Sequence, residues 1–136
     1  MRTKIRDNIR QGMPVLAECG GYMYLSESME DMDGNVYPMV QAVPGNVYRT
    51  KKLGRFGYIT LTPNTKDTFR NGGNPVRGHE FHYFDSTDCG SAWHAAKPLR
   101  KRNWECIHAT KRMMAGFPHL YYMACLLYTS PSPRDA

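Results

Sequence analysis

The sequence predicts an α/β fold in which a sharp turn carrying a nucleophile joins a buried strand to a helix. A helical stretch at residues 2–11 is followed by a short apolar strand at 14–18, which is half of an α/β unit. Cys19 and the two glycines directly after it then separate this strand from a second helical pattern at 21–29. Further along the chain, short β-branched and aromatic runs broken by Pro and Gly indicate more strands.

The first helix is recognised by its apolar face and by its end. Ile5 and Ile9 are four residues apart, so they lie on one side of a helix. Gly12 is suited to end this helix, and Pro14 prevents it from continuing. The chain is therefore expected to leave the helix and enter a strand.

The later elements follow from turn residues and from the spacing of apolar side chains. Tyr22, Leu25 and Met29 give the second helix its apolar pattern. After it, we expect a turn at 31–34, strands at 36–43, 46–50, 56–62 and 76–84, a polar loop at 64–75, a loop at 85–101, a strand at 103–110, a turn at 114–116, and a strand or a turn into a helix at 117–123.

Length and composition indicate one modest globular domain. The chain has 136 residues, of which 41% are hydrophobic, so wholesale disorder is not expected. No apolar stretch approaches the ~18 residues that cross a membrane, and no signal-peptide core is seen, so a cytoplasmic protein without membrane contact is predicted. The four cysteines include no CxxC pair, which argues against a zinc knuckle and a disulfide framework.

The net charge of +6 comes mostly from two basic runs, at residues 49–55 and 97–102. Basic runs can bind nucleic acid, but no aromatic stacking motif is interleaved with these two. Solvated loops or contacts to a partner are the favoured interpretation, and no nucleic-acid partner is predicted.

Cys19 is the candidate nucleophile. The helix that follows directs N–H groups and a positive dipole end at the thiol, which favours the thiolate. The same N–H groups, that of Gly20 above all, can stabilise an oxyanion. A buried structural cysteine beside a glycine turn is the alternative, and the local pattern alone does not separate the two.

A cysteine nucleophile needs a base that is close in space, usually a histidine. His119 lies at the end of a late strand, where it can meet a turn cysteine across an α/β sheet. The alternative for this residue is a structural histidine. His94 is expected at the surface, and His108 is expected to be structural.

The Gly-His-Glu-Phe-His-Tyr run at residues 78–83 is not the HExxH zinc motif, because its second histidine comes one residue early. On a strand, Glu80 and His82 share one face and His79 lies on the other, so the two histidines do not chelate one metal easily. No metal site is predicted. Glu80 and His82 form either part of a polar pocket or a satisfied structural pair.

Five blocks occur in a characteristic order, and the two most specific are Ala-Glu-Cys-Gly-Gly at 17–21 and Arg-Gly-His-Glu-Phe-His at 77–82. The full set covers residues 12–25, 33–39, 53–58, 77–83 and 116–122. Over about residues 3–124 the chain resembles the glutamine amidotransferase domain of the cobyrinate a,c-diamide synthases, among the cobyric acid synthase-like class I amidotransferases. The resemblance implies a partial class I, flavodoxin-like three-layer sandwich with a nucleophile elbow.

The resemblance also implies a chemistry. Cys19 attacks the side-chain amide of glutamine to give a glutamyl thioester and ammonia, and water then releases glutamate. His119 raises the nucleophilicity of the cysteine, and Gly20 and Gly21 form the oxyanion and substrate-binding turn. The subfamily lacks the usual third carboxylate, so a Cys–His dyad is expected. Glu18, Glu80 and His82 are then supporting residues, and Glu80 is not promoted to the triad.

In the family, the ammonia passes to an ATP-activated carboxylate of a corrinoid precursor in cobalamin biosynthesis. That chemistry belongs to an amino-terminal P-loop domain that needs ATP and Mg²⁺. No GxxxxGK[ST] occurs here, so no cofactor is expected in this chain. A related tetrapyrrole enzyme, such as a nickel-sirohydrochlorin a,c-diamide synthase, is a close alternative. A catalytically silent interaction module and a cysteine hydrolase of peptides or esters are alternatives from other classes.

The chain also departs from the family pattern. The earlier strands and a glycine-rich oxyanion loop are absent, so both ends are expected to be truncated. Phe84 replaces the usual serine, and Cys106 and the 92–102 stretch match no family pattern. Residues 125–136 resemble a translated sequencing adapter, with a flexible Ser/Pro terminus as the alternative. The predicted domain is therefore 1–124, followed by a tail at 125–136.

Overall fold

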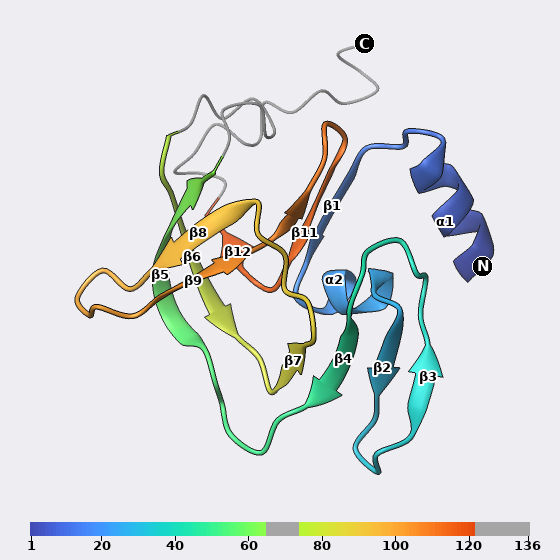
Figure 1. The fold of residues 1–136 in the computed structure, drawn as a ribbon, viewed down its shortest axis with the longest axis horizontal. Helices are drawn as coiled ribbons and strands as arrows, with labels where there is room; N and C mark the ends of the chain where they lie inside the picture. Colours follow the sequence, from blue (N-terminus) through green and yellow to red (C-terminus); the bar gives the residue numbers. More distant parts are fainter. Residues whose placement is uncertain (65–73, 122–136) are drawn as a thin grey trace.

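The computed structural model describes residues 1–64 and 74–121 and shows a mixed α/β chain made mostly of strands (Figure 1). The helices are α1 (Arg2–Arg10) and α2 (Gly20–Leu25). The strands are β1 (Val15–Glu18), β2 (Ser28–Glu30), β3 (Val36–Pro38), β4 (Asn46–Arg49), β5 (Phe56–Pro63), β6 (Val76–Phe81), β7 (Phe84–Ser86), β8 (Trp93–Ala96), β9 (Asn103–Cys106), β10 (His108–Ala109), β11 (Met113–Gly116) and β12 (His119–Leu120). The tail predicted at 125–136 and most of the polar loop predicted at 64–75 lie outside the described residues.

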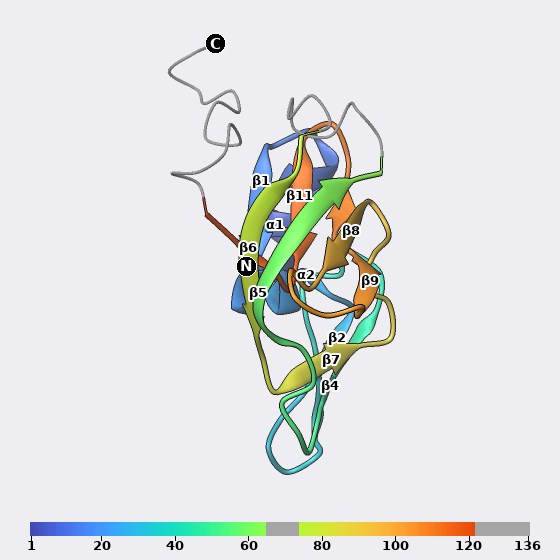
Figure 2. The same cartoon turned by 90° about the vertical axis from the view of Figure 1, so that its left-hand side faces the viewer.

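The strands form three sheets. The first has the order β1-β11-β10, with β1 parallel to β11 and β10 antiparallel to it. The second is antiparallel, in the order β12-β6-β5-β8-β9, and the third has the order β3-β2-β4-β7. In both views the third sheet lies at the lower end of the molecule, while α2 lies beside β1 and β11 (Figures 1 and 2).

β11 is the central strand of the core because both of its faces are buried. Met113 and Ala115 pack with the apolar residues of α2, such as Tyr22, whereas Met114 packs under the five-stranded sheet with Trp93. The predicted turn at 114–116 is therefore wrong. A short apolar run ending in glycine does not distinguish a turn from a strand that is buried on both sides.

The first predicted helix was confirmed as α1, and the second was confirmed as α2 but with the wrong end. α1 ends where expected, at Gly12 with φ +99°, and Ile5 and Ile9 pack against the core. The second helix ends at Leu25, not at residue 29. Ser26 is extended, and its hydroxyl donates to the carbonyl of Met23, so the chain leaves the helix and enters β2.

The predicted strands at 46–50 and 56–62 correspond to β4 and β5. Three other predictions were too long. The 36–43 run contains only β3, and its later part includes Gln41 at φ +62°. The 76–84 run divides into β6 and β7, which belong to different sheets, and the 103–110 run breaks at Ile107, where φ is +70°. Left-handed φ at a non-glycine residue interrupts strand geometry.

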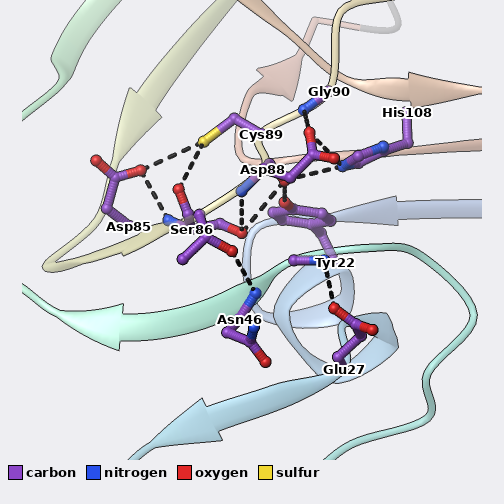
Figure 3. Close-up of polar contacts among 11 residues, drawn as sticks. Tyr22, Glu27, Asn46, Asp85, Ser86, Asp88, Cys89, Gly90 and His108 are labelled. Carbon is purple, nitrogen blue, oxygen red and sulfur yellow. Dashed lines mark hydrogen bonds and ion pairs between the residues drawn. The ribbon is translucent and has the colours of Figure 1, made fainter.

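The loop predicted at 85–101 was wrong, because it contains most of β7 and all of β8. Its first part is fixed by polar contacts to α2 and β10 (Figure 3). The Asp88 carbonyl accepts from the Tyr22 hydroxyl at 2.9 Å and lies 3.0 Å from Nε2 of His108, which gives that histidine a structural contact. Gly90 is required here because a Cβ at this position would lie 2.4 Å from the backbone of Ile107.

The two basic runs meet at one side chain. The guanidinium carbons of Arg55 and Arg102 lie 5.3 and 5.8 Å from the centre of the Trp104 ring. This arrangement offers two cation–π contacts and gives both arginines a partner within the chain. No helix of the described residues is long and apolar enough to cross a membrane.

Candidate active site

Cys19 occupies the turn between β1 and α2 in a conformation that few non-glycine residues adopt, with φ +49°. Its N–H donates to the carbonyl of Gly116 at 2.9 Å, and its carbonyl accepts from the N–H of Met23 at 2.9 Å. The first bond ties the turn to the end of β11, and the second starts the helix. The backbone that carries the thiol is therefore fixed on both sides.

The thiol is half-buried and lies 4.0 Å from the carbonyl oxygen of Phe81, at the end of β6. Burial raises the pKa of the Cys19 thiol above its ordinary value; a bond from the Gly20 N–H opposes this shift, and the charges of Glu80 and Glu18 add to it. The predicted thiolate-favouring effect of the helix is thus outweighed. The raised pKa favours the thiol over the thiolate at neutral pH.

We expect alkylation of Cys19 by iodoacetamide to be slow near neutral pH and to accelerate above pH ~9, because only the thiolate is nucleophilic. Peptide-resolved mass spectrometry across a pH series measures the rate. Cys89 is the internal comparison, since burial raises the pKa of its thiol to about 11 and its reaction should begin at higher pH. A Cys19 rate already maximal at neutral pH would contradict the raised pKa.

His119 begins β12, which pairs with β6 so that His119 lies opposite His79. The two imidazole rings are stacked, with centroids 4.8 Å apart and an interplanar angle of 14°. Nδ1 of His119 lies 3.9 Å from Oε2 of Glu18, and the same oxygen accepts the Leu120 N–H at 2.8 Å. The last residue of β1 therefore holds the backbone of β12 and faces its histidine.

The structure brings Cys19 and His119 to neighbouring strand ends. β1 and β11 are parallel, with Glu18 opposite Gly116, so the residues that follow each strand emerge at the same edge of the sheet. Among the described residues, the polar contact of His119 is with Glu18, and the thiol and the imidazole form no hydrogen bond. Such contacts are often long before substrate binds.

Glu80 and His82 share one face, as predicted, and form a pair inside the protein. Glu80 Oε2 lies 3.1 Å from Nε2 of His82, and Oε1 accepts from Trp104 Nε1 at 3.3 Å. The exposed fractions of Glu80 and His82 are only 1% and 5%. The His82 ring stacks on Phe117 with centroids 4.0 Å apart. The pair thus supports the segment that leads into His119.

The two glycines after Cys19 are exposed and are not tightly packed. A Cβ at Gly20 would meet no atom within 4 Å, and one at Gly21 would lie 3.7 Å from the Cβ of Ala17. Neither position therefore requires glycine for packing. The space beside Gly20 is available to a bound molecule.

A hollow of about 350 Å³ adjoins the site on the exposed side of β5 and β6. Two of the residues that line the hollow contact the site: the carbonyl of Phe81 faces the Cys19 thiol, and His79 stacks on His119. Aromatic side chains of Phe56, Tyr58 and Tyr121 line the rest. The described residues contain no group of three or more His, Cys, Asp or Glu side chains that could hold a metal ion.

His79 was a candidate histidine in the sequence, but its stacking on His119, and the contact of Leu120 with Glu18, were not predicted. Both residues reach the site because β12 pairs with β6, and no local pattern in the sequence predicts that pairing. The alternation of the 76–83 run places His79 opposite to Glu80 and His82, and this was the only available signal.

The comparisons with known proteins agree on one family. A family model described as CobB/CobQ-like glutamine amidotransferase domain matches residues 1–124. The cobyrinate a,c-diamide synthase of Fusobacterium nucleatum is 42% identical over 126 residues, covering 90% of this chain and 27% of that protein. The protein of the same name from Caldanaerobacter subterraneus is 37% identical over 122 residues, covering 88% of this chain and 27% of its own length. The chain thus spans about 27% of the length of these curated relatives.

Proposed function

The chain belongs to the family of CobB/CobQ-like glutamine amidotransferase domains, and on this premise we propose that it hydrolyses the side-chain amide of glutamine and releases ammonia. The observation that carries the proposal is the parallel pairing of β1 with β11, which sets the Cys19 turn beside the segment that bears His119. A thiol and an imidazole at one strand edge are the parts that acyl transfer requires.

In the proposed mechanism His119 takes the proton of the Cys19 thiol, and the sulfur attacks the amide carbon of glutamine. The tetrahedral intermediate collapses as the C–N bond breaks, and His119 returns its proton to the leaving nitrogen, which departs as ammonia. His119 then deprotonates water, which attacks the thioester carbon. The C–S bond breaks, glutamate leaves and the thiol is restored.

We assign the oxyanion role to the backbone N–H of Gly20, with Gly21 completing the substrate-binding turn. The positive φ of Cys19 and the open space at Gly20 support a nucleophile elbow at this turn. The parallel pair β1–β11, with α1 and α2 packed against the same cluster, is the part of the chain that fits a flavodoxin-like sandwich. Glutamine would enter from the hollow beside Phe81 and His79.

We propose that the ammonia serves a corrinoid diamidation, because the relatives bear the name cobyrinate a,c-diamide synthase. ATP and Mg²⁺ would act in the part of those longer proteins that this chain does not span, since the sequence contains no P-loop motif. The same domain could serve nickel-sirohydrochlorin diamidation, and the names of the relatives favour the corrinoid.

A catalytically silent interaction module is the second candidate. Two observations favour it: the raised pKa of the Cys19 thiol, and the polar contacts of Cys19 and His119, which among the described residues are with Phe81 and Glu18 and not with each other. The match over residues 1–124 and the shared strand edge of the two side chains favour the enzyme.

Labelling with a glutamine-analogue diazoketone separates these two candidates. The 136-residue chain and its Cys19→Ser variant are treated with the reagent and digested, and the adducts are located by mass spectrometry. Circular dichroism on the same samples checks folding. An adduct on Cys19 that excess glutamine suppresses, and that the variant lacks, supports the enzyme. A folded chain without an adduct supports the silent module.

We expect Gly78→Ala to lower the rate of glutamine hydrolysis about 10²-fold, because misplacing a catalytic group by about 1 Å has an effect of this size. A Cβ at Gly78 would lie 2.5 Å from the carbonyl oxygen of His119, so β12 must shift. Gly54→Ala is the matched control, since a Cβ there meets no atom within 4 Å. Initial rates at saturating glutamine measure the effect, and equal rates for the two variants would contradict the placement of His119.

A further inference from the structure

Within residues 1–64 and 74–121, Glu18 is the one carboxylate that forms an ion-pair contact with His119. Its Oε2 lies 3.9 Å from Nδ1 of the imidazole. Both oxygens of Glu80, the other carboxylate of the site, already have partners: one faces His82 and the other faces Trp104. Glu18 is therefore the acidic group with an oxygen directed at the histidine.

The Glu18 carboxylate is held in place by the strand that carries its partner. Oε2 accepts the Leu120 N–H at 2.8 Å, and Leu120 directly follows His119. The Glu18 side chain is only 20% exposed. Burial raises the pKa of Glu18, whereas the bond from Leu120 and the neighbouring His79 lower it. The bond to the Leu120 N–H thus fixes the Glu18 carboxylate relative to the histidine of β12.

The imidazole is restrained from a second direction. His79 stacks on one face of the His119 ring, with centroids 4.8 Å apart, which restrains rotation of the ring about its Cβ–Cγ bond. The two nitrogens of an imidazole lie on different edges, so a ring whose Nδ1 faces Glu18 keeps Nε2 free for another partner. The Cys19 turn begins directly after Glu18, so the Cys19 thiol is the candidate partner for Nε2.

Given the proposed function, on which this assignment rests, we propose that Glu18 is a positioning residue that orients His119 toward the Cys19 thiol. The chain then uses a triad whose carboxylate directly precedes the nucleophile, in place of the dyad expected from the sequence. The contact of 3.9 Å closes to a hydrogen bond when substrate orders the site, as contacts of this kind tighten in complexes. Glu18 exchanges no proton: it fixes which nitrogen carries one.

Glu18→Gln tests the assignment in the 136-residue chain. The glutamine oxygen still accepts the Leu120 N–H, but the charge facing Nδ1 is lost. We expect kcat for glutamine hydrolysis to fall about 10–100-fold, the range seen when an orienting partner is removed, while KM stays within about twofold. The rate of diazoketone labelling of Cys19 should fall by the same factor, and the urea midpoint should not change.

Glu27→Gln is the matched control, because Glu27 also accepts one backbone N–H, that of Gly45 at 3.0 Å, and lies outside the site (Figure 3). Its kcat should equal that of the parent. Glu18→Asp, which keeps the charge, should be more active than the Gln variant. If Glu18→Gln does not fold, the isosteric pair Glu18→Asp and Glu18→Asn makes the same comparison, and the Asp variant should be the more active of the two.

Two outcomes overturn the assignment and are distinguishable. A Glu18→Gln variant with kcat within about twofold of the parent, or an Asp variant no better than Gln, removes Glu18 from the mechanism and leaves the glutaminase intact. A parent chain that is folded but neither hydrolyses glutamine nor reacts with the diazoketone removes the proposed function, and the role of Glu18 with it.

Discussion

Replacing Cys19 by serine is expected to lower glutamine hydrolysis by about 10³–10⁵-fold, because loss of a nucleophile that acts together with its base leaves only binding and oxyanion stabilisation. Burial raises the pKa of the Cys19 thiol, and a serine hydroxyl is harder still to deprotonate. Ammonia release in a coupled assay measures the rate. The fold should survive, since the side chain is only half-buried.

His119→Asn completes this prediction with an expected loss of about 10²–10⁴-fold, the usual contribution of a general base. His94→Asn is its control: that imidazole is partly exposed and pairs with Glu105 at 2.9 Å on the far strands β8 and β9. A double variant, Cys19→Ser with His119→Asn, should be no slower than the slower single variant. Losses that simply add would show that the two residues do not act as a unit.

The second large effect is on stability. Glu80→Ala is expected to lower the free energy of unfolding by about 3–5 kcal/mol, because it leaves a buried imidazole and a partly buried indole N–H without this partner. Glu80 is 1% exposed and contacts both His82 and Trp104. A loss of this size is comparable with the whole stability of a small domain. Urea unfolding followed by tryptophan fluorescence measures it.

Glu105→Ala is the matched control, since it removes a carboxylate from an exposed pair with His94. Its expected effect is less than about 1 kcal/mol, because water replaces the lost contact. Equal losses for the two variants would mean that the Glu80 pair does not stabilise the core. Glu80→Gln, which keeps an acceptor, should lie between them.

The elements that the sequence predicted correctly are those with a local signal. Gly12 and Pro14 mark the end of α1, and Cys19 with its glycines marks the turn into α2. β11 was missed because both of its faces are buried, so its residues Met113–Gly116 do not alternate between apolar and polar side chains. Without that alternation the sequence gives no sign of a strand. The 85–90 segment was missed because polar contacts, which have no period, hold it.

In the candidate site, too, the features with a local sequence signal could be predicted and those that depend on strand pairing could not. The shared face of Glu80 and His82 could be predicted from strand alternation and is confirmed. The family was recognised from short blocks, and the match over residues 1–124 confirms it. The contact between Glu18 and His119 could not be predicted, because it depends on which strands pair and in which register.

The parallel pairing of β1 with β11 also has a consequence for synthesis. Val15 pairs with Met113, close to the other end of the described chain, so the growing polypeptide carries Cys19 long before any segment exists that can complete its surroundings. Contacts between distant segments form late and set the pace of folding. The nascent chain should therefore present an ordinary, solvent-accessible thiol on the ribosome. The proposed chemistry at this residue becomes possible only after the ribosome has made residues 113–116, which pair with β1.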